Sequence, residues 1–223
     1  RRLVLNHSTF VGVSVGVHPQ ANTGGVFRAV KSHTTLESVV FIGPNAVTGG
    51  GIFASDASEV VIKGGLLAVG AQASSHLPPR QPLLGNGTSV SLTSMRRIWG
   101  SFFNGSAEQI CDSTSLGEAS RGGFLALSLR SRATILASAH PTLIAGNCAQ
   151  LGGAIYLADS SSLEINVSRR ARNASVQAVV LAANRASAGG AVYSTGQSEV
   201  HISTQNDDVL ILVGNAAARG GGA

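Results

Sequence analysis

Short apolar runs alternate along this chain with turns that are rich in Gly, Asn, Ser and Asp. The runs are three to six residues long and contain many β-branched residues, as at 39–42, 59–62, 191–193 and 209–212. Brief runs of this composition, bounded by turn residues, predict β-strands. Because no window keeps the apolar period of about 3.6 residues that a helix requires, the pattern predicts an all-β protein.

A short phrase recurs along the chain and sets the order of these predicted strands. It begins with Asn, has a small residue two places later, and ends in a pair of glycines followed by an aliphatic residue. The glycine pairs recur about every 26 to 37 residues, apart from one double-length gap between Gly51 and Gly122. A repeat of this length predicts a solenoid. The residues assigned to the repeat are Asn45, Gly50, Gly51, Gly122, Gly123, Asn147, Gly152, Gly153, Asn184, Gly189, Gly190, Asn215, Gly220 and Gly221.

Each repeat holds about three predicted strands, which is the plan of a right-handed parallel β-helix with three parallel sheets. We expect about seven coils in a single domain over 1–223, with diverged coils and a proline-rich loop within 66–116. The glycine pair suits a corner, because glycine reaches positive φ at little cost and has no Cβ to collide with the next coil. The repeated Asn suits a hydrogen-bonded ladder between coils.

The step from Ile144 to Asn147 and from Leu181 to Asn184, followed by Gly-Gly-Ala-Ile or Gly-Gly-Ala-Val, resembles the repeats of the polymorphic outer-membrane protein family. The resemblance covers residues 17–62 and 117–223, and is poor over 63–116. It departs from the family pattern where Ile or Leu replaces Phe ahead of the Asn. The resemblance implies a β-helical surface protein with an adhesive or structural role, and it implies no catalytic residues.

Composition narrows the partners that we expect. The net charge is +5, but the basic residues are scattered singles and pairs without interleaved aromatics, so nucleic acid is not an expected partner. Other copies of the chain, other fibre proteins and acidic glycans are the expected partners. No apolar run approaches the roughly 20 residues that cross a bilayer. The chain ends inside a repeat without a polar cap, so we expect it to be part of a longer protein.

Five Asn-x-Ser/Thr sequons favour a secreted or cell-surface glycoprotein, and they place expected glycans on coil exteriors or loops. The sequon residues are Asn6, Asn86, Asn104, Asn166 and Asn173. The two cysteines, Cys111 and Cys148, either form one bridge in an oxidising compartment or remain buried or free thiols. No His stands at metal-ligand spacing to either cysteine, so no metal or other cofactor is expected.

Evidence for catalysis is poor. A glycosidase needs two carboxylates that face one groove, about 5 to 9.5 Å apart. Asp56 and Asp159 share a repeat position but are expected to lie several coils apart. Asp207-Asp208 is the one dense acidic step, and it is interpreted as a turn before the run 209–212.

The sequence therefore predicts a non-enzymatic segment that forms a stiff extracellular rod. Two alternatives stay open. One is a polysaccharide-active enzyme whose acidic site lies outside this chain, which predicts acidic residues on neighbouring coils of one face. The other is a bacterial autotransporter passenger, which shares the fold.

Overall fold

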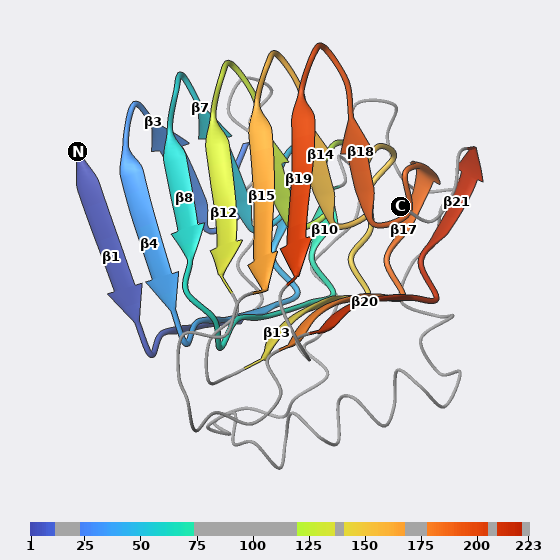
Figure 1. The fold of residues 1–223 in the computed structure, drawn as a ribbon, viewed down its shortest axis with the longest axis horizontal. Helices are drawn as coiled ribbons and strands as arrows, with labels where there is room; N and C mark the ends of the chain where they lie inside the picture. Colours follow the sequence, from blue (N-terminus) through green and yellow to red (C-terminus); the bar gives the residue numbers. More distant parts are fainter. Residues whose placement is uncertain (12–22, 74–119, 137–140, 168–177, 205–208, 220–223) are drawn as a thin grey trace.

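The computed structural model describes residues 1–11, 23–73, 120–136, 141–167, 178–204 and 209–219. Every regular element among them is a β-strand, and every pairing between strands is parallel. The strands stack into a parallel β-helix, which confirms the predicted fold class. In Figure 1 the chain descends in the front sheet and returns upward behind it as it advances from the N-terminal to the C-terminal side, which is a right-handed path.

Three long sheets run the length of the stack. Sheet A contains β1 (Arg2–Asn6), β4 (His33–Glu37), β8 (Glu59–Ile62), β12 (Arg132–Leu136), β15 (Ser162–Val167) and β19 (Glu199–Thr204). Sheet B contains β2 (Thr9–Val11), β5 (Val40–Ile42), β9 (Leu67–Val69), β13 (Thr142–Ala145), β16 (Ala178–Ala182) and β20 (Val209–Val213). Sheet D contains β3 (Phe27–Val30), β7 (Ile52–Ser55), β11 (Leu125–Leu127), β14 (Ile155–Leu157) and β18 (Val192–Ser194).

A fourth side of the helix is less regular. Two short pairs form sheet C, β6 (Asn45–Ala46) with β10 (Gln72–Ala73) and β17 (Arg185–Ala188) with β21 (Ala216–Arg219). Single bridges link Thr48 to Arg121 and Arg121 to Leu151 between these pairs. The path around one coil is therefore D, A, B and then C.

The described strands make six coils, where about seven were expected for the whole chain. β11 pairs directly with β7, β12 with β8 and β13 with β9, so no further coil stands between them in the stack. Residues 66–73, expected to belong to a diverged coil, contribute the regular strand β9 and the short strand β10. Residues 74–119, which join β10 to β11, lie outside the described part of the chain.

The core is a column of side chains that alternate inward along each strand. In sheet A the column Leu36, Ile62, Ile135 and Ile165 is at most 1% exposed. Near the N-terminal end Phe41 stacks at 5.5 Å on Phe10. Sheet B is apolar on both faces, because its outward residues form a second buried cluster.

The glycine pairs lie at the corner that leads into sheet D. The first glycine of each pair has φ between 62° and 72°, at Gly24, Gly49, Gly122, Gly152 and Gly189. The second glycine lies against the next coil. A Cβ on Gly153 would collide with the carbonyl oxygen of Gly190 and lie 2.7 Å from the backbone nitrogen of Arg185.

The glycine pair ahead of β7 lies one residue earlier than the repeat in the sequence predicted. Gly49 and Gly50 align with Gly152 and Gly153, so Gly51 takes the position of Ala154. Three consecutive glycines fit the phrase in two ways. The structure selects the one that places Ile52 in the interior column of sheet D, where it is fully buried.

An asparagine ladder links the last three coils where sheet B ends. Asn147 Nδ2 donates to Asn184 Oδ1 at 2.8 Å, and Asn184 Nδ2 donates to Asn215 Oδ1 at 2.9 Å. Asn184 Oδ1 also accepts the backbone N–H of Asn147, and Asn215 Oδ1 accepts the backbone N–H of Asn184, each at 3.0 Å. In the two preceding coils Ala71 and Pro44 occupy the ladder position. Asn45 is therefore one residue past the ladder position in its own coil.

Candidate functional site

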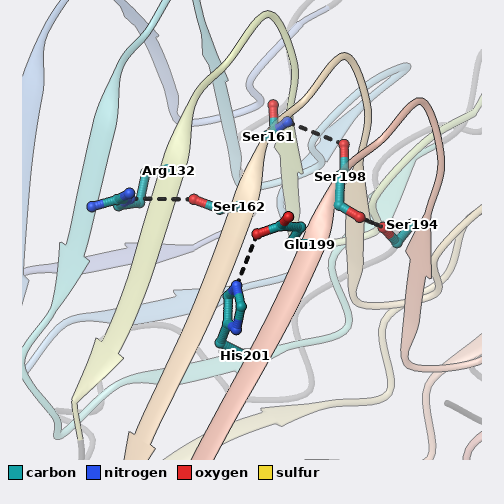
Figure 2. A network of polar contacts seen from close by, with 7 residues as sticks. All are labelled: Arg132, Ser161, Ser162, Ser194, Ser198, Glu199 and His201. Carbon is teal, nitrogen blue, oxygen red and sulfur yellow. Dashed lines mark hydrogen bonds and ion pairs between the residues drawn. The ribbon is translucent and has the colours of Figure 1, made fainter.

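Polar side chains gather on the outer face of sheet A, where Figure 2 shows those of β12, β15 and β19. His201 Nε2 lies 2.9 Å from Glu199 Oε2 within β19. Arg132 Nε donates to Ser162 Oγ at 3.2 Å across the β12–β15 step. The side chains of His201 and Glu199 are 66% and 70% exposed. This face is open to solvent and available to large partners.

The same face carries a second charged group near the N-terminal end. His33 Nδ1 lies 2.8 Å from Glu59 Oε2 on the neighbouring strand, and His33 Nε2 lies 3.1 Å from Thr35 Oγ1. His33 and Glu59 are register partners in β4 and β8. Their side chains are 38% and 47% exposed, so the pair contributes little to stability.

Two pairs of carboxylates lie on neighbouring coils of this face, Glu37 with Glu59 on β4 and β8, and Glu164 with Glu199 on β15 and β19. Glu164 in β15 is the register partner of His201, and Glu199 lies two residues before His201 in β19. This arrangement meets the criterion set for the enzyme alternative. However, a catalytic site needs groups that are held in place and shielded from water. A hollow of about 380 Å³ among the described residues lies elsewhere, at the C-terminal end of the stack, and Glu164 and Glu199 do not line it.

The outer face of sheet D carries an aromatic column. Phe53, Ala126, Tyr156 and Tyr193 are register partners on consecutive strands. The rings of Tyr156 and Tyr193 stack at 6.0 Å with an interplanar angle of 4°. The Arg121 guanidinium lies 5.5 Å from the centroid of the Tyr156 ring, within the range of a cation–π contact.

The electrostatics of Tyr156 follow from this packing. Burial raises the pKa of the Tyr156 hydroxyl above its ordinary value of 10.0. Arg121 opposes that rise, while Asp159 and Tyr193 add to it. Because Tyr156 is only 6% exposed, its ring serves contacts within the protein rather than stacking on a ligand.

The structure brings Asp56 and Asp159 closer together than the sequence analysis expected. They occupy one corner column, with only Leu129 between them, so two coil steps separate them. At about 4.8 Å per step, their backbones lie roughly 10 Å apart. All three residues have positive φ, between 52° and 57°. Both carboxylates are exposed or partly exposed on this corner, and neither lines the hollow at the C-terminal end of the stack.

Two of the five sequon residues lie within described strands. Asn6 ends β1 and is exposed, and Asn166 lies within β15 with its side chain partly buried. The sheet A register places both in one outward column, four coil steps apart. The Oδ1 atom of Asn166 is buried without a hydrogen-bond partner. Asn86, Asn104 and Asn173 lie outside the described residues.

Several other predicted residues also fall outside the described part of the chain. They are Gly220, Gly221, Cys111 and the acidic step Asp207-Asp208. Cys148 is 1% exposed and is disulfide-bonded. Among the described residues no three His, Cys, Asp or Glu side chains form a group that could hold a metal ion.

A serine ladder, which sequence reasoning missed, runs along the corner that enters sheet A. The Oγ of each serine accepts the backbone N–H of the corresponding residue one coil back. Ser58 N donates to Ser131 Oγ at 3.2 Å, Ser131 N to Ser161 Oγ at 3.2 Å and Ser161 N to Ser198 Oγ at 3.1 Å. The signal was a serine directly before each sheet A strand from β4 to β19.

These features define the class of the protein as a parallel β-helix repeat protein, with Asn and Ser ladders at two corners and glycine pairs at a third. No protein-family model, no curated protein and no solved structure matches the chain. No helix in the described part of the chain has the length and apolar composition to span a membrane.

Proposed function

We propose that this chain is a structural and adhesive segment of an extracellular or cell-surface glycoprotein, in which the β-helix acts as a stiff rod. The observation that carries the proposal is the pair of ladders that tie successive coils together. Asn147 and Asn184 are fully buried, and Ser131 and Ser161 are 1% exposed. These polar groups satisfy backbone N–H groups of the neighbouring coil, so they serve the stack rather than a ligand.

Mechanical stiffness follows from the way the coils are joined. In a solenoid each repeat contacts only its neighbours, so overall stability is a sum of nearest-neighbour terms. Here the coil steps combine parallel backbone pairing in the long sheets with a continuous apolar column. The serine ladder joins the coils from β8 to β19, and the asparagine ladder joins the last three coils. Bending the rod would open all of these contacts along one side of the stack.

The outer faces of the rod support an adhesive role. The outer face of sheet A offers exposed Arg132, Glu199 and His201 beside the column that contains Asn6 and Asn166. Glycans on that column would project from the same side of the rod. Other copies of the chain, other fibre proteins and acidic glycans remain the proposed partners.

The positions of the carboxylates do not support a polysaccharide-active enzyme as a second candidate function. Glu164 and Glu199 lie on neighbouring coils, but Glu199 is 70% exposed. Asp56 and Asp159 flank Leu129 on an exposed corner, about two coil steps apart. Neither pair is positioned and desolvated as the two carboxylates of a glycosidase are.

The proposal is tested on the native protein by peptide mass spectrometry before and after enzymatic removal of N-glycans. We expect an N-glycan on Asn6, the exposed site. We also expect that protease treatment of intact cells releases peptides of this chain. Asn184 serves as an internal control, because it is buried, outside any sequon and should stay unmodified. A protein that is resistant to protease on intact cells and bare at all five sequons would contradict a surface glycoprotein.

A further inference from the structure

The outward side chains of sheet B form an apolar face in the middle of the stack. Each is at most 7% exposed, although outward positions on a solenoid strand ordinarily face water. They form two register columns, one of Val40, Leu67, Leu143 and Val180 and the other of Ile42, Val69, Ala145 and Ala182. Their strands, β5, β9, β13 and β16, each have a sheet neighbour on both sides, so the face does not depend on the ends of the stack.

The described strands do not account for this burial. In the same coil as Leu143, the outward residues Arg132 and Thr134 of sheet A are exposed and half-buried. Among the described apolar residues, only Ala178 and Ile211 pack against the sheet B face, and both belong to sheet B. An apolar sheet face is buried only where a second layer packs on it, so that layer comes from another part of the chain.

Residues 74–119 have the length and composition of such a layer. The segment has 46 residues and follows β10, which comes directly after β9 of sheet B along the chain. It contains the only tryptophan of the chain, Trp99, close to Phe102 and Phe103. The two columns extend over three coil steps, roughly 14 Å at about 4.8 Å per step, which is a short distance for a segment of this length.

The other segments that adjoin sheet B suit this role less well. Segments 137–140 and 205–208 have only four residues each, and they connect sheet A to sheet B. Segment 168–177 makes the same connection and contains three arginines, whose charges resist burial. Segment 12–22 begins after β2, four coil steps from β16.

A covalent bond places residues 74–119 beside the apolar face. Cys148 is disulfide-bonded, and Cys111 is the only other cysteine of the chain, so the two are partners. Cys148 lies three residues after Ala145, which ends β13 and belongs to the apolar face. The bond therefore holds residue 111 at the edge of that face.

We propose that residues 74–119 pack across the outer face of sheet B, where the Cys111–Cys148 disulfide fixes them. Trp99 and its apolar neighbours then form a second core with the two columns of sheet B. The inference goes beyond the proposed rod function, because it gives the rod a side module on sheet B. The outer face of sheet A stays free for partners.

The first test measures the fluorescence of Trp99 in the purified 223-residue chain with its disulfide intact. We expect a blue-shifted emission that moves to the red in urea together with the loss of the β-sheet circular dichroism signal, because one cooperative unit loses both signals at once. An emission maximum that already has its solvent value without urea would overturn the proposal. This measurement needs no variant.

The second test places a charge in the middle of the apolar face. Leu143→Asp should shift the Trp99 emission to the red, because Leu143 is 5% exposed. It should also speed trypsin cleavage after Arg96 and Arg97 by roughly tenfold or more, since the open state of residues 74–119 becomes more populated.

Thr134→Asp is the matched control, because Thr134 lies in the same coil on the outer face of sheet A and is half-buried. It should leave the emission and the cleavage rate unchanged. A folded Leu143→Asp variant with unchanged emission and unchanged cleavage would overturn the proposal, because another segment would then cover sheet B. Either contrary result leaves the rod function intact.

Discussion

Ala183 occupies a corner position that other coils give to glycine. Its φ is 50°, while the equivalent residues Gly43, Gly70, Gly146 and Gly214 have φ between 59° and 66°. The left-handed region costs an L-residue about 1–2 kcal/mol, and glycine avoids most of that cost. A Cβ would meet no atom within 4 Å at Gly43 or Gly70, so backbone conformation rather than space sets the preference at this corner.

We therefore expect Ala183→Gly to stabilise the protein, by about 0.5–1 kcal/mol after the entropic cost of glycine in the unfolded chain. The measurement is the urea midpoint of unfolding. Ala182→Gly is the neighbouring control, because Ala182 lies in β16 and is 5% exposed. That change should lower the midpoint through lost packing and added chain freedom. A fall of similar size in both variants would refute the strain argument.

At the scale of the strand and its corner, the asparagine ladder converts sequence repetition into contacts between coils. Asn184 Oδ1 accepts from the backbone nitrogen and from Nδ2 of Asn147, at 3.0 and 2.8 Å. Asn184 Nδ2 donates to the Ile144 carbonyl at 3.1 Å. Asn147 is fully buried, so water cannot replace a lost partner there.

Asn184→Ala should destabilise the protein by about 2–4 kcal/mol, because it removes the Oδ1 atom that accepts from the buried backbone N–H and from Nδ2 of Asn147. Asn215→Ala removes the same ladder contacts from the last coil, where the side chain is only partly buried. We expect about half the loss there, since truncating the partly buried Asn215 side chain opens the freed donors of Asn184 to water. Urea unfolding monitored by circular dichroism compares the two. Equal, small losses would mean that the ladder is incidental to the stability of the stack.

The sequence located part of this arrangement and missed part of it, for physical reasons. Asn147, Asn184 and Asn215 recur at spacings of 37 and 31 residues, and the three strands within each step have the same lengths of three, six and five residues. The repeat pattern assigned Asn45 to the ladder position wrongly, because the three consecutive glycines at 49–51 allow two alignments of the repeat. The serine ladder escaped notice because serine is common, and its partner lies one coil away, 73 residues distant for Ser58 and Ser131.

Contacts between residues distant in the sequence also explain why about seven coils were predicted and the described strands make six. A gap of double length is compatible either with an extra coil or with an insertion into one coil. The pairings of β7 with β11, β8 with β12 and β9 with β13 distinguish them, and these pairings join residues about 73 to 76 positions apart. Local patterns specify which residues form strands and which face is apolar. They do not specify which strands become neighbours.

For the molecule as a whole, the register makes the coils interchangeable. Leu163 in β15 and Val200 in β19 occupy one inward column, and Glu164 and His201 occupy one outward column. Since each coil contacts only its neighbours, removing one coil in phase should leave a shorter rod with the same internal contacts. The stability lost should be one coil's share rather than the whole fold.

Deleting residues 164–200 tests this, because the cut joins Leu163 to His201 and removes one 37-residue period. We expect a folded, β-rich protein with a lower urea midpoint. Deleting 164–199 instead joins Leu163 to Val200, and the shift of one residue turns His201 inward and Ile202 outward. That variant, although one residue longer, should lose far more stability. If both deletions unfold the protein alike, the coils are not equivalent units and stability depends on features particular to one of them.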